Sequence, residues 1–232
     1  MKLALFFVHC FFWGFGLHVL AQEETRFEFS PQTAKPIAKA LMKEDFFWSS
    51  IDDSGPFGSD AGSDAAYGFY HWRSTHPDDP PLTYLQQLIN GWRFPPISWE
   101  ETDTGKIRAY MSIGYHPSEA EIQQSIEILK KANSRPGVRQ LTDSALRKVV
   151  LSSGTGMGLT YLNNIDEAIV GTAFAQIVME GKIDPKLKRY AAIALRREML
   201  LLITRQFGQP DQIKSHNDKS KKMLSVLNYF DR

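Results

Sequence analysis

The residues of this sequence best suited to chemistry lie between positions 51 and 73. Residues 51–64 read IDDSGPFGSDAGSD, with four aspartates among glycines and serines. Glycine adopts backbone conformations that other residues avoid and proline fixes a turn, so such a loop can gather its carboxylates. Carboxylate and carbonyl oxygens are the ligands of hard cations such as calcium. Asp53, Asp60 and Asp64 are therefore candidate binding residues, with Asp60 and Asp64 as candidate metal ligands.

A helix cap is the alternative role for the same aspartates. Their spacing departs from the EF-hand loop, which alternates its carboxylates and places a glutamate at its twelfth position. Residues 64–75 are predicted to form a helix, and Ser63 or Asp64 can cap its first turn. Asp60 and Asp64 also favour the positive end of that helix. The pattern favours the cap over the metal site.

His71 and Trp72 follow on the same predicted helix. Asp64 and His71 are seven residues apart, which places them on one side of the helix, and a carboxylate with a histidine can act as an acid/base pair or as two metal ligands. His71 and His76 are five residues apart and lie on different faces, so no two-histidine zinc motif forms. We take His71 and Trp72 as candidate binding residues, and no residue qualifies as catalytic.

The tryptophans outside the first 21 residues all lie in the first half of the chain. Such an aromatic cluster can line a groove for sugars or peptides, although we expect most of it to belong to the core. The four are Trp48, Trp72, Trp92 and Trp99.

The first 21 residues have the pattern of a secretory signal peptide. A short positive start is followed by the apolar run 3–20, and Ala21 provides a cleavage context. A retained membrane anchor is the alternative, because 18 apolar residues are at the lower limit for spanning a bilayer. Removal of the signal predicts a periplasmic or secreted protein, residues 22–232, without a membrane span.

The predicted mature chain has neither cysteine nor net charge. Cys10 is the one cysteine and belongs to the signal, which excludes a disulfide framework, a thiolate metal site and a cysteine nucleophile. Loss of Lys2, the one charged residue in the signal, lowers the formal charge from +1 to 0. A neutral chain lacks the field typical of nucleic-acid binders, so we expect no nucleic-acid partner.

The glycine-rich residues 152–158, SSGTGMG, resemble a phosphate loop only superficially. No Lys-Ser/Thr pair follows, and the glycine spacing fits neither a P-loop nor a dinucleotide fold. We expect a connector here, with an anion-binding loop as the alternative. No intact cofactor motif is present, and the cofactor is unknown.

The hydrophobic periodicity predicts a mainly α, single-domain bundle of about seven or eight helices, with the Gly/Asp-rich loop between the first two. The partial alternation of residues 106–113 favours a short edge strand and leaves room for one short strand pair. Residues 101–163 are the least regular part and a candidate insertion. The expected helices lie after Pro31, over 64–75 and 82–91, after Pro117 and Thr142, from Asn164, from Pro185 to beyond Met199, and after Pro210.

The helix from Pro185 carries basic residues on one side, which we expect to be solvated rather than to receive an acidic partner. These residues are Lys186, Lys188, Arg189, Arg196, Arg197 and Arg205.

Two blocks of the chain resemble the uncharacterised bacterial YfeS-like proteins. The first, 36–100, combines a helix, the Asp-Phe-Phe-Trp stretch, the loop DDSGPFGSDAGSD, an aromatic helix and Gly91-Trp92. The second, 164–205, contains DEAIVGTAFAQIVMEGKID. The resemblance implies no established activity and carries over no catalytic residue. The export signal of this chain also sets it apart from any cytoplasmic role inferred for such relatives.

These observations favour a non-catalytic binding or interaction protein of the bacterial cell envelope, with a protein partner and residues 52–72 as its contact surface. The competing hypothesis is a metal-dependent envelope hydrolase that uses Asp53, Asp60, Asp64 and His71. It requires these side chains to converge in an open pocket.

Overall fold

The computed structural model describes residues 27–114, 117–133, 141–153, 156–204 and 208–231, and these ranges form a mainly helical, single-domain bundle. They contain ten α-helices and one 3-10 helix, and no strand occurs within them. The predicted signal peptide, residues 1–21, lies outside the described residues. No helix in the described ranges is both long enough and apolar enough to cross a membrane.

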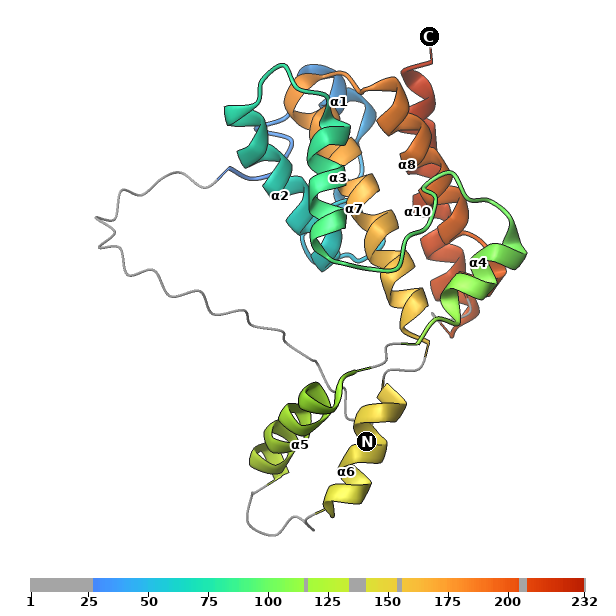
Figure 1. The fold of residues 1–232 in the computed structure, drawn as a ribbon. Coiled ribbons are helices and arrows are strands. Elements are labelled where there is room, and N and C mark those ends of the chain that lie inside the picture. The colour runs from blue at the N-terminus through green and yellow to red at the C-terminus, as the bar shows by residue number, and fades with distance from the viewer. Residues whose placement is uncertain (1–26, 115–116, 134–140, 154–155, 205–207, 232) are drawn as a thin grey trace.

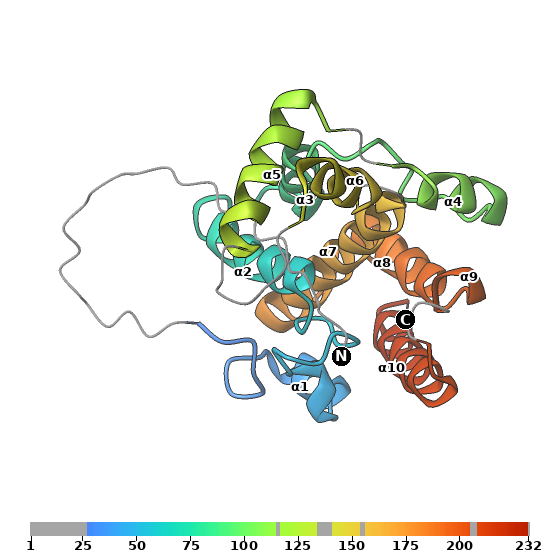
Figure 2. The ribbon, with the colours of Figure 1, turned by 90° about the horizontal axis from the view of Figure 1, so that it is seen from below.

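Helix α7 (Met157–Glu180) runs through the middle of the body (Figure 1). It is buried almost all round because most of residues 165–178 are apolar and these apolar residues occur on every face, which is the pattern of a core helix. Figure 2 shows α7 in a middle layer with α2 (Asp60–Thr75) and α8 (Pro185–Glu198). Helix α7 starts well before Asn164, where the sequence predicted its cap.

The other helices of the body cover the two faces of this layer. Figure 2 shows α3 (Pro81–Gly91) and α4 (Thr104–Met111) on one face. It shows α1 (Pro36–Leu41) and α10 (Pro210–Tyr229) on the other face. Trp48, Trp72, Trp92 and Trp99 are all half-buried and pack against the main core.

Helices α2 and α7 approach each other at a pair of glycines. A Cβ atom added to Gly171 would lie 2.3 Å from the carbonyl oxygen of Gly62, so only glycine permits this approach. The contact brings the start of α2 against the middle of α7. It thereby places the aspartates of the Asp-rich loop beside the carboxylates of α7.

The predicted strand at residues 106–113 is wrong, because α4 occupies this segment. The Asp103 side chain accepts a hydrogen bond from the Lys106 amide at 2.8 Å and caps the helix. Ile107 and Tyr110 are three residues apart and are both buried, in a small cluster with Ile203 of α9 (Leu201–Thr204). A spacing of three fits one face of a helix and not one face of a strand.

Helix α2 begins four residues earlier than predicted. Its N-cap is Ser59, whose hydroxyl accepts a hydrogen bond from the Gly62 amide at 3.1 Å, rather than Ser63 or Asp64. Asp60 therefore sits in the first turn, and Asp64 lies one turn further along.

Two further helix boundaries differ from the prediction. Helix α1 begins at Pro36, after a turn at Pro31, and it is preceded by a bend rather than by a first helical turn. Helix α8 ends at Glu198, and the short α9 follows it. The predicted continuation beyond Met199 is therefore wrong.

Helices α5 (Glu119–Asn133) and α6 (Asp143–Ser153) form a hairpin that stands beyond the lower end of the body in Figure 1. The hairpin has a small core of its own, made by Ile122, Ile126, Leu146 and Val150. This hairpin makes up most of the segment 101–163 that the sequence marked as a candidate insertion.

Candidate functional site

A cleft of about 910 Å³ opens beside the Asp-rich loop. Its walls come from the loop and the start of α2, the segment after α3, the first half of α7, the end of α8, and α10. Polar and aromatic residues both line it. They include Asp53, Ser59, Asp60, Asp64, Trp92, Phe94, Thr160, Asn163, Asn164, Glu167, Glu198 and His216.

Five carboxylates line this cleft. Asp53, Asp60 and Asp64 come from the predicted loop and helix, and Glu167 and Glu198 come from α7 and α8. Within the described ranges the three aspartates and Glu167 form no ion pair. The Nε2 atom of His216 lies 3.9 Å from the Oε2 atom of Glu198.

The Asp-rich loop is fixed to α10 by polar contacts. Asp52 pairs with Lys219 at 2.6 Å and accepts a hydrogen bond from the Ser54 amide at 3.1 Å. The Ser54 hydroxyl lies 3.2 Å from Nδ1 of His216. A Cβ on Gly58 would lie 1.9 Å from the Asp52 carbonyl oxygen, so the loop folds back tightly on itself. These contacts hold Asp53 at the edge of the cleft.

Burial dominates the electrostatics of the deeper carboxylates. Burial raises the pKa of Glu167 from its ordinary value of 4.5 to about 7. The charges of Asp166, Asp53 and Asp60 add to this rise, whereas a hydrogen bond from Ser59 lowers the pKa. Burial also holds the pKa of Glu198 well above its usual range, with further contributions from Asp166 and Glu167. Near neutral pH, part of the cleft is therefore protonated and can release protons.

Burial also shifts the pKa of Asp64 and of His216, in opposite directions. Burial, followed by the charge of Asp60, raises the pKa of Asp64. Burial, followed by the charge of Lys219, lowers the pKa of His216. A histidine that tends to stay neutral does little to offset the acidic cleft.

Arg197 precedes the cleft residue Glu198 and is already paired. Its side chain and that of Asp166 are each only 1% exposed, and Nε of Arg197 donates to Oδ2 of Asp166 at 2.9 Å while Nη2 contacts Oδ1. Nη1 donates to the Glu101 carbonyl oxygen at 2.9 Å. The expectation that Arg197 belongs to a solvated basic face is thus wrong. Periodicity predicted its side of α8 to be outward, but the buried Asp166 of α7 draws it inward.

One wall of the cleft is aromatic. Trp92 and Phe94 follow α3, with ring centroids 5.3 Å apart, and Phe94 stacks on Tyr161 at 4.5 Å. The start of α7 adds the amide side chain of Asn164 and the hydroxyl of Thr160. The cleft therefore combines negative charge, an aromatic surface and hydrogen-bonding groups.

The structure separates the five predicted binding residues into two groups. Asp53, Asp60 and Asp64 line the cleft, whereas His71 and Trp72 do not. His71 is exposed, with its ring against the edge of Tyr70 at 5.2 Å, and Trp72 stacks on His76 at 4.7 Å. Among the described residues, no three His, Cys, Asp or Glu side chains are placed to hold a metal ion.

Sequence reasoning missed Glu167, Glu198 and His216. Glu167 carried one signal, since it is a carboxylate next to the most apolar stretch of the chain. Glu198 and His216 lie in segments with ordinary amphipathic patterns and carried none.

Of the glycine-rich connector, residues 154–155 lie outside the described ranges, and Gly158 packs against the backbone of Tyr110.

Comparisons with protein-family models, curated proteins and solved structures found no match to this chain. The resemblance to YfeS-like proteins therefore stays a prediction, and the functional argument depends on the cleft.

Proposed function

We propose that this chain is a non-catalytic binding protein of the bacterial cell envelope and that its cleft binds an organic cation. One observation carries the proposal: five carboxylates line a single cleft, and no lysine or arginine of the described residues pairs with them. Asp53, Asp60 and Asp64 are exposed, and Glu167 and Glu198 lie deeper. A cleft lined by charges of one sign focuses their field and concentrates ions of the opposite sign. A cationic ligand would supply the missing partner.

The size and the walls of the cleft favour an organic cation over a bare metal ion. A volume of about 910 Å³ is within the range of small-molecule sites. Trp92 and Phe94 offer ring faces, which attract ammonium and guanidinium groups. The described carboxylates also lack the close grouping that a metal ion needs.

The alternative of a metal-dependent hydrolase draws no support from this geometry. It required His71 to join the aspartates in a pocket, and His71 lies outside the cleft. Export remains part of the proposal. A protein partner also remains part of it, because a basic side chain of that partner can provide the cation as well as a free amine can.

Thermal unfolding of residues 22–232 tests the proposal, with spermidine and arginine as organic cations and calcium, magnesium, manganese and zinc as metal ions. A ligand at about 100 times its Kd stabilises a fold by roughly 2.7 kcal/mol, which corresponds to a shift of several degrees. We expect an organic cation to raise the melting temperature, and we expect the variants Glu167→Gln and Asp60→Asn each to reduce this rise.

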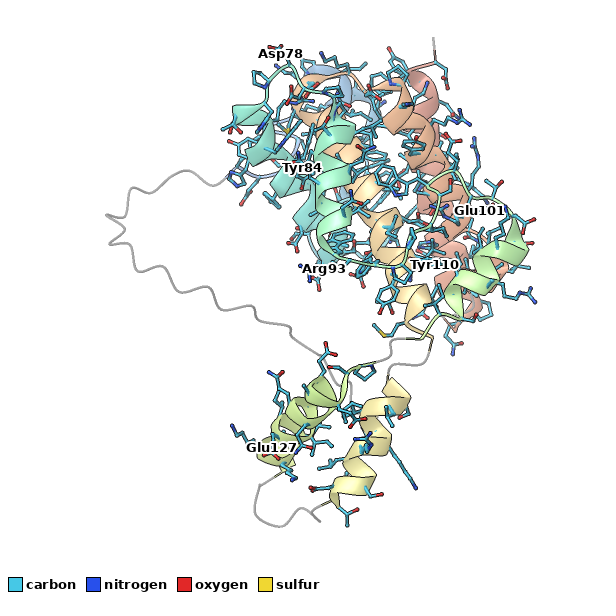
Figure 3. All side chains as sticks on the ribbon, in the orientation of Figure 1. Asp78, Tyr84, Arg93, Glu101, Tyr110 and Glu127 are labelled. Atoms are coloured by element: carbon cyan, nitrogen blue, oxygen red, sulfur yellow. The ribbon has the colours of Figure 1, made fainter. Side chains whose placement is uncertain are left out.

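The matched control is Asp78→Asn, an exposed aspartate that does not line the cleft. Figure 3 shows Asp78 at the opposite end of the α2 and α3 pair from Arg93, which neighbours Trp92. This variant should keep the full shift. No shift with either organic cation, or an equal loss in all three variants, would contradict the proposal, and a shift with metal ions alone would replace the organic cation by a metal.

A further inference from the structure

A second cavity, of about 490 Å³, lies outside the cleft and shares none of its lining residues. It is formed by α3, by the segment between α3 and α4, and by the first half of α8. The volume is within the range of small-molecule sites. Its walls combine two aromatic rings with four polar side chains. These residues are Trp99, Tyr190, Gln86, Ser98, Glu100 and Lys186.

The two aromatic rings of the second cavity form a corner. The ring planes of Trp99 and Tyr190 meet at 86°, and their centroids are 5.5 Å apart. Both side chains pack against the main core but are only half-buried, so part of each remains exposed where it lines the cavity. A half-buried aromatic side chain offers apolar contact beside water, which suits the C–H face of a sugar ring.

Arg197 holds one wall of the second cavity in place. Its Nη1 atom donates to the carbonyl oxygen of Glu101 at 2.9 Å and to that of Trp99 at 3.5 Å. Its guanidinium group is itself fixed by the buried pair with Asp166. The Glu101 amide also donates to the Ser98 carbonyl oxygen at 3.0 Å and closes a turn around Trp99. The wall is therefore preorganised, which lowers the entropic cost of binding a ligand.

The polar groups of the second cavity suit a sugar better than a peptide. A peptide that binds as an added strand needs open backbone groups. The carbonyl oxygens of Ser98, Trp99 and Glu101 each already accept a hydrogen bond. The cavity offers polar side chains instead, namely an amide, a hydroxyl, a carboxylate and an ammonium group. Together they donate and accept hydrogen bonds, as the hydroxyl groups of a sugar do.

The charges around the second cavity favour a ligand with an anionic group. Glu100 is already paired, because its Oε2 atom lies 3.2 Å from Nη2 of Arg189. Lys186 is exposed and forms no ion pair within the described ranges. The excess positive charge at Lys186 attracts an anion.

We propose that the second cavity binds a saccharide that carries a carboxylate. The sugar ring lies against Trp99 and Tyr190, its hydroxyl groups hydrogen-bond to Gln86 and Ser98, and its carboxylate lies at Lys186. The inference is independent of the organic cation proposed for the cleft, because the two sites have separate walls and take ligands of opposite charge.

Calorimetric titration of residues 22–232 tests the proposal with three probes of equal length. A hexamer of galacturonic acid combines sugar rings with carboxylates, cellohexaose has the sugar rings alone, and hexaglutamate has the carboxylates alone. We expect the galacturonic acid hexamer to bind about threefold more tightly than cellohexaose, since an exposed ion pair contributes little. Hexaglutamate should bind more weakly than either sugar.

Gln86→Ala and Gln87→Ala form a matched pair of variants. Both residues are exposed glutamines of α3, and of the two only Gln86 lines the second cavity. Gln86→Ala should raise the Kd for the galacturonic acid hexamer about threefold to tenfold, and Gln87→Ala should leave it unchanged. Tyr190→Ala should raise this Kd at least about tenfold. Lys186→Met should abolish the preference for the acidic sugar over cellohexaose.

Four results would overturn the inference. They are no binding of the galacturonic acid hexamer at about 10 mM, equal Kd values for the two sugars, hexaglutamate binding as tightly as the acidic sugar, and equal effects of Gln86→Ala and Gln87→Ala. Gln86 and Lys186 are exposed, so their variants keep the fold even if Tyr190→Ala disturbs it.

Discussion

The pair of α2 and α7 and the pair of α5 and α6 are both helix pairs, but they are stabilised in different ways. In the first, glycines bring the backbones together, the surrounding helices cover the contact, and the nearby Arg197–Asp166 pair is 1% exposed on each side. In the second, four side chains form the core, and the Arg147–Glu119 pair is 42% and 77% exposed. The same types of residue therefore contribute very different free energies in the two places.

The largest difference should appear when each arginine is removed. Arg197→Met leaves the Asp166 carboxylate buried without its partner, so we expect a loss of about 3–5 kcal/mol in the free energy of unfolding. Arg147→Met removes an exposed pair and should cost far less. Urea denaturation of both variants measures the difference. Losses of similar size in the two variants would show that burial is not what separates the two regions. In a further variant, Asp166→Leu added to Arg197→Met should recover much of the lost stability.

Core truncations should separate global from local unfolding. Phe174→Ala empties a fully buried site in α7 and should cost about 3–5 kcal/mol across the whole body. Leu146→Ala removes one of four core side chains of the hairpin and should expose the amides of α5 and α6 while the body keeps its melting temperature. Hydrogen exchange with calorimetry distinguishes these results. A lowered melting temperature of the body in Leu146→Ala would mean that hairpin and body unfold as one unit.

The cleft should make the stability of the body depend on pH. The folded chain keeps a proton on Glu167 up to a pKa of about 7, whereas the unfolded chain loses it near 4.5. The folded state binds more protons in this window, so the group's contribution to stability falls as pH rises from about 4.5 to 7. Glu167→Gln should therefore gain on the order of 2–3 kcal/mol over the wild type between pH 5 and pH 8.

The control for this pH effect is Glu127→Gln on the exposed flank of α5. Its stability should follow the wild-type curve with pH, because Glu127 is exposed in the hairpin. Denaturant unfolding at several pH values measures both variants. A Glu167→Gln curve parallel to the wild type would contradict the raised pKa.

The smallest effect should come from the two helix caps. Ser59→Ala and Ser118→Ala each remove a hydroxyl that interacts with the first turn of a helix, and each should cost about 1 kcal/mol, in the body and in the hairpin respectively. Ser59→Ala alone should also raise the pKa of Glu167 further, because the hydrogen bond from Ser59 lowers it. A carboxyl-selective NMR titration reads that pKa. An unchanged value would show that Ser59 acts only as a cap.

The presence of a helix proved easier to predict than the residues at which it begins and ends or the other helices against which it packs. The segment 82–91 was placed to within one residue, because Pro81 and the spacing of Leu85 and Ile89 are local signals. The strand predicted at 106–113 failed because the apolar residues of so short a segment fit two periods, and the cap at Asp103 decides between them.

The sequence by itself determined the helical class, the placement of the Gly/Asp-rich loop and the identity of three cleft aspartates, because periodicity and turn chemistry act over a few residues. Only the tertiary structure decided that Glu167, Glu198 and His216 join those aspartates and that Arg197 turns inward to Asp166. Helical periodicity fixes which residues share a face of one helix, but not which distant helix that face meets. That choice depends on packing, here on the close approach of Gly62 and Gly171.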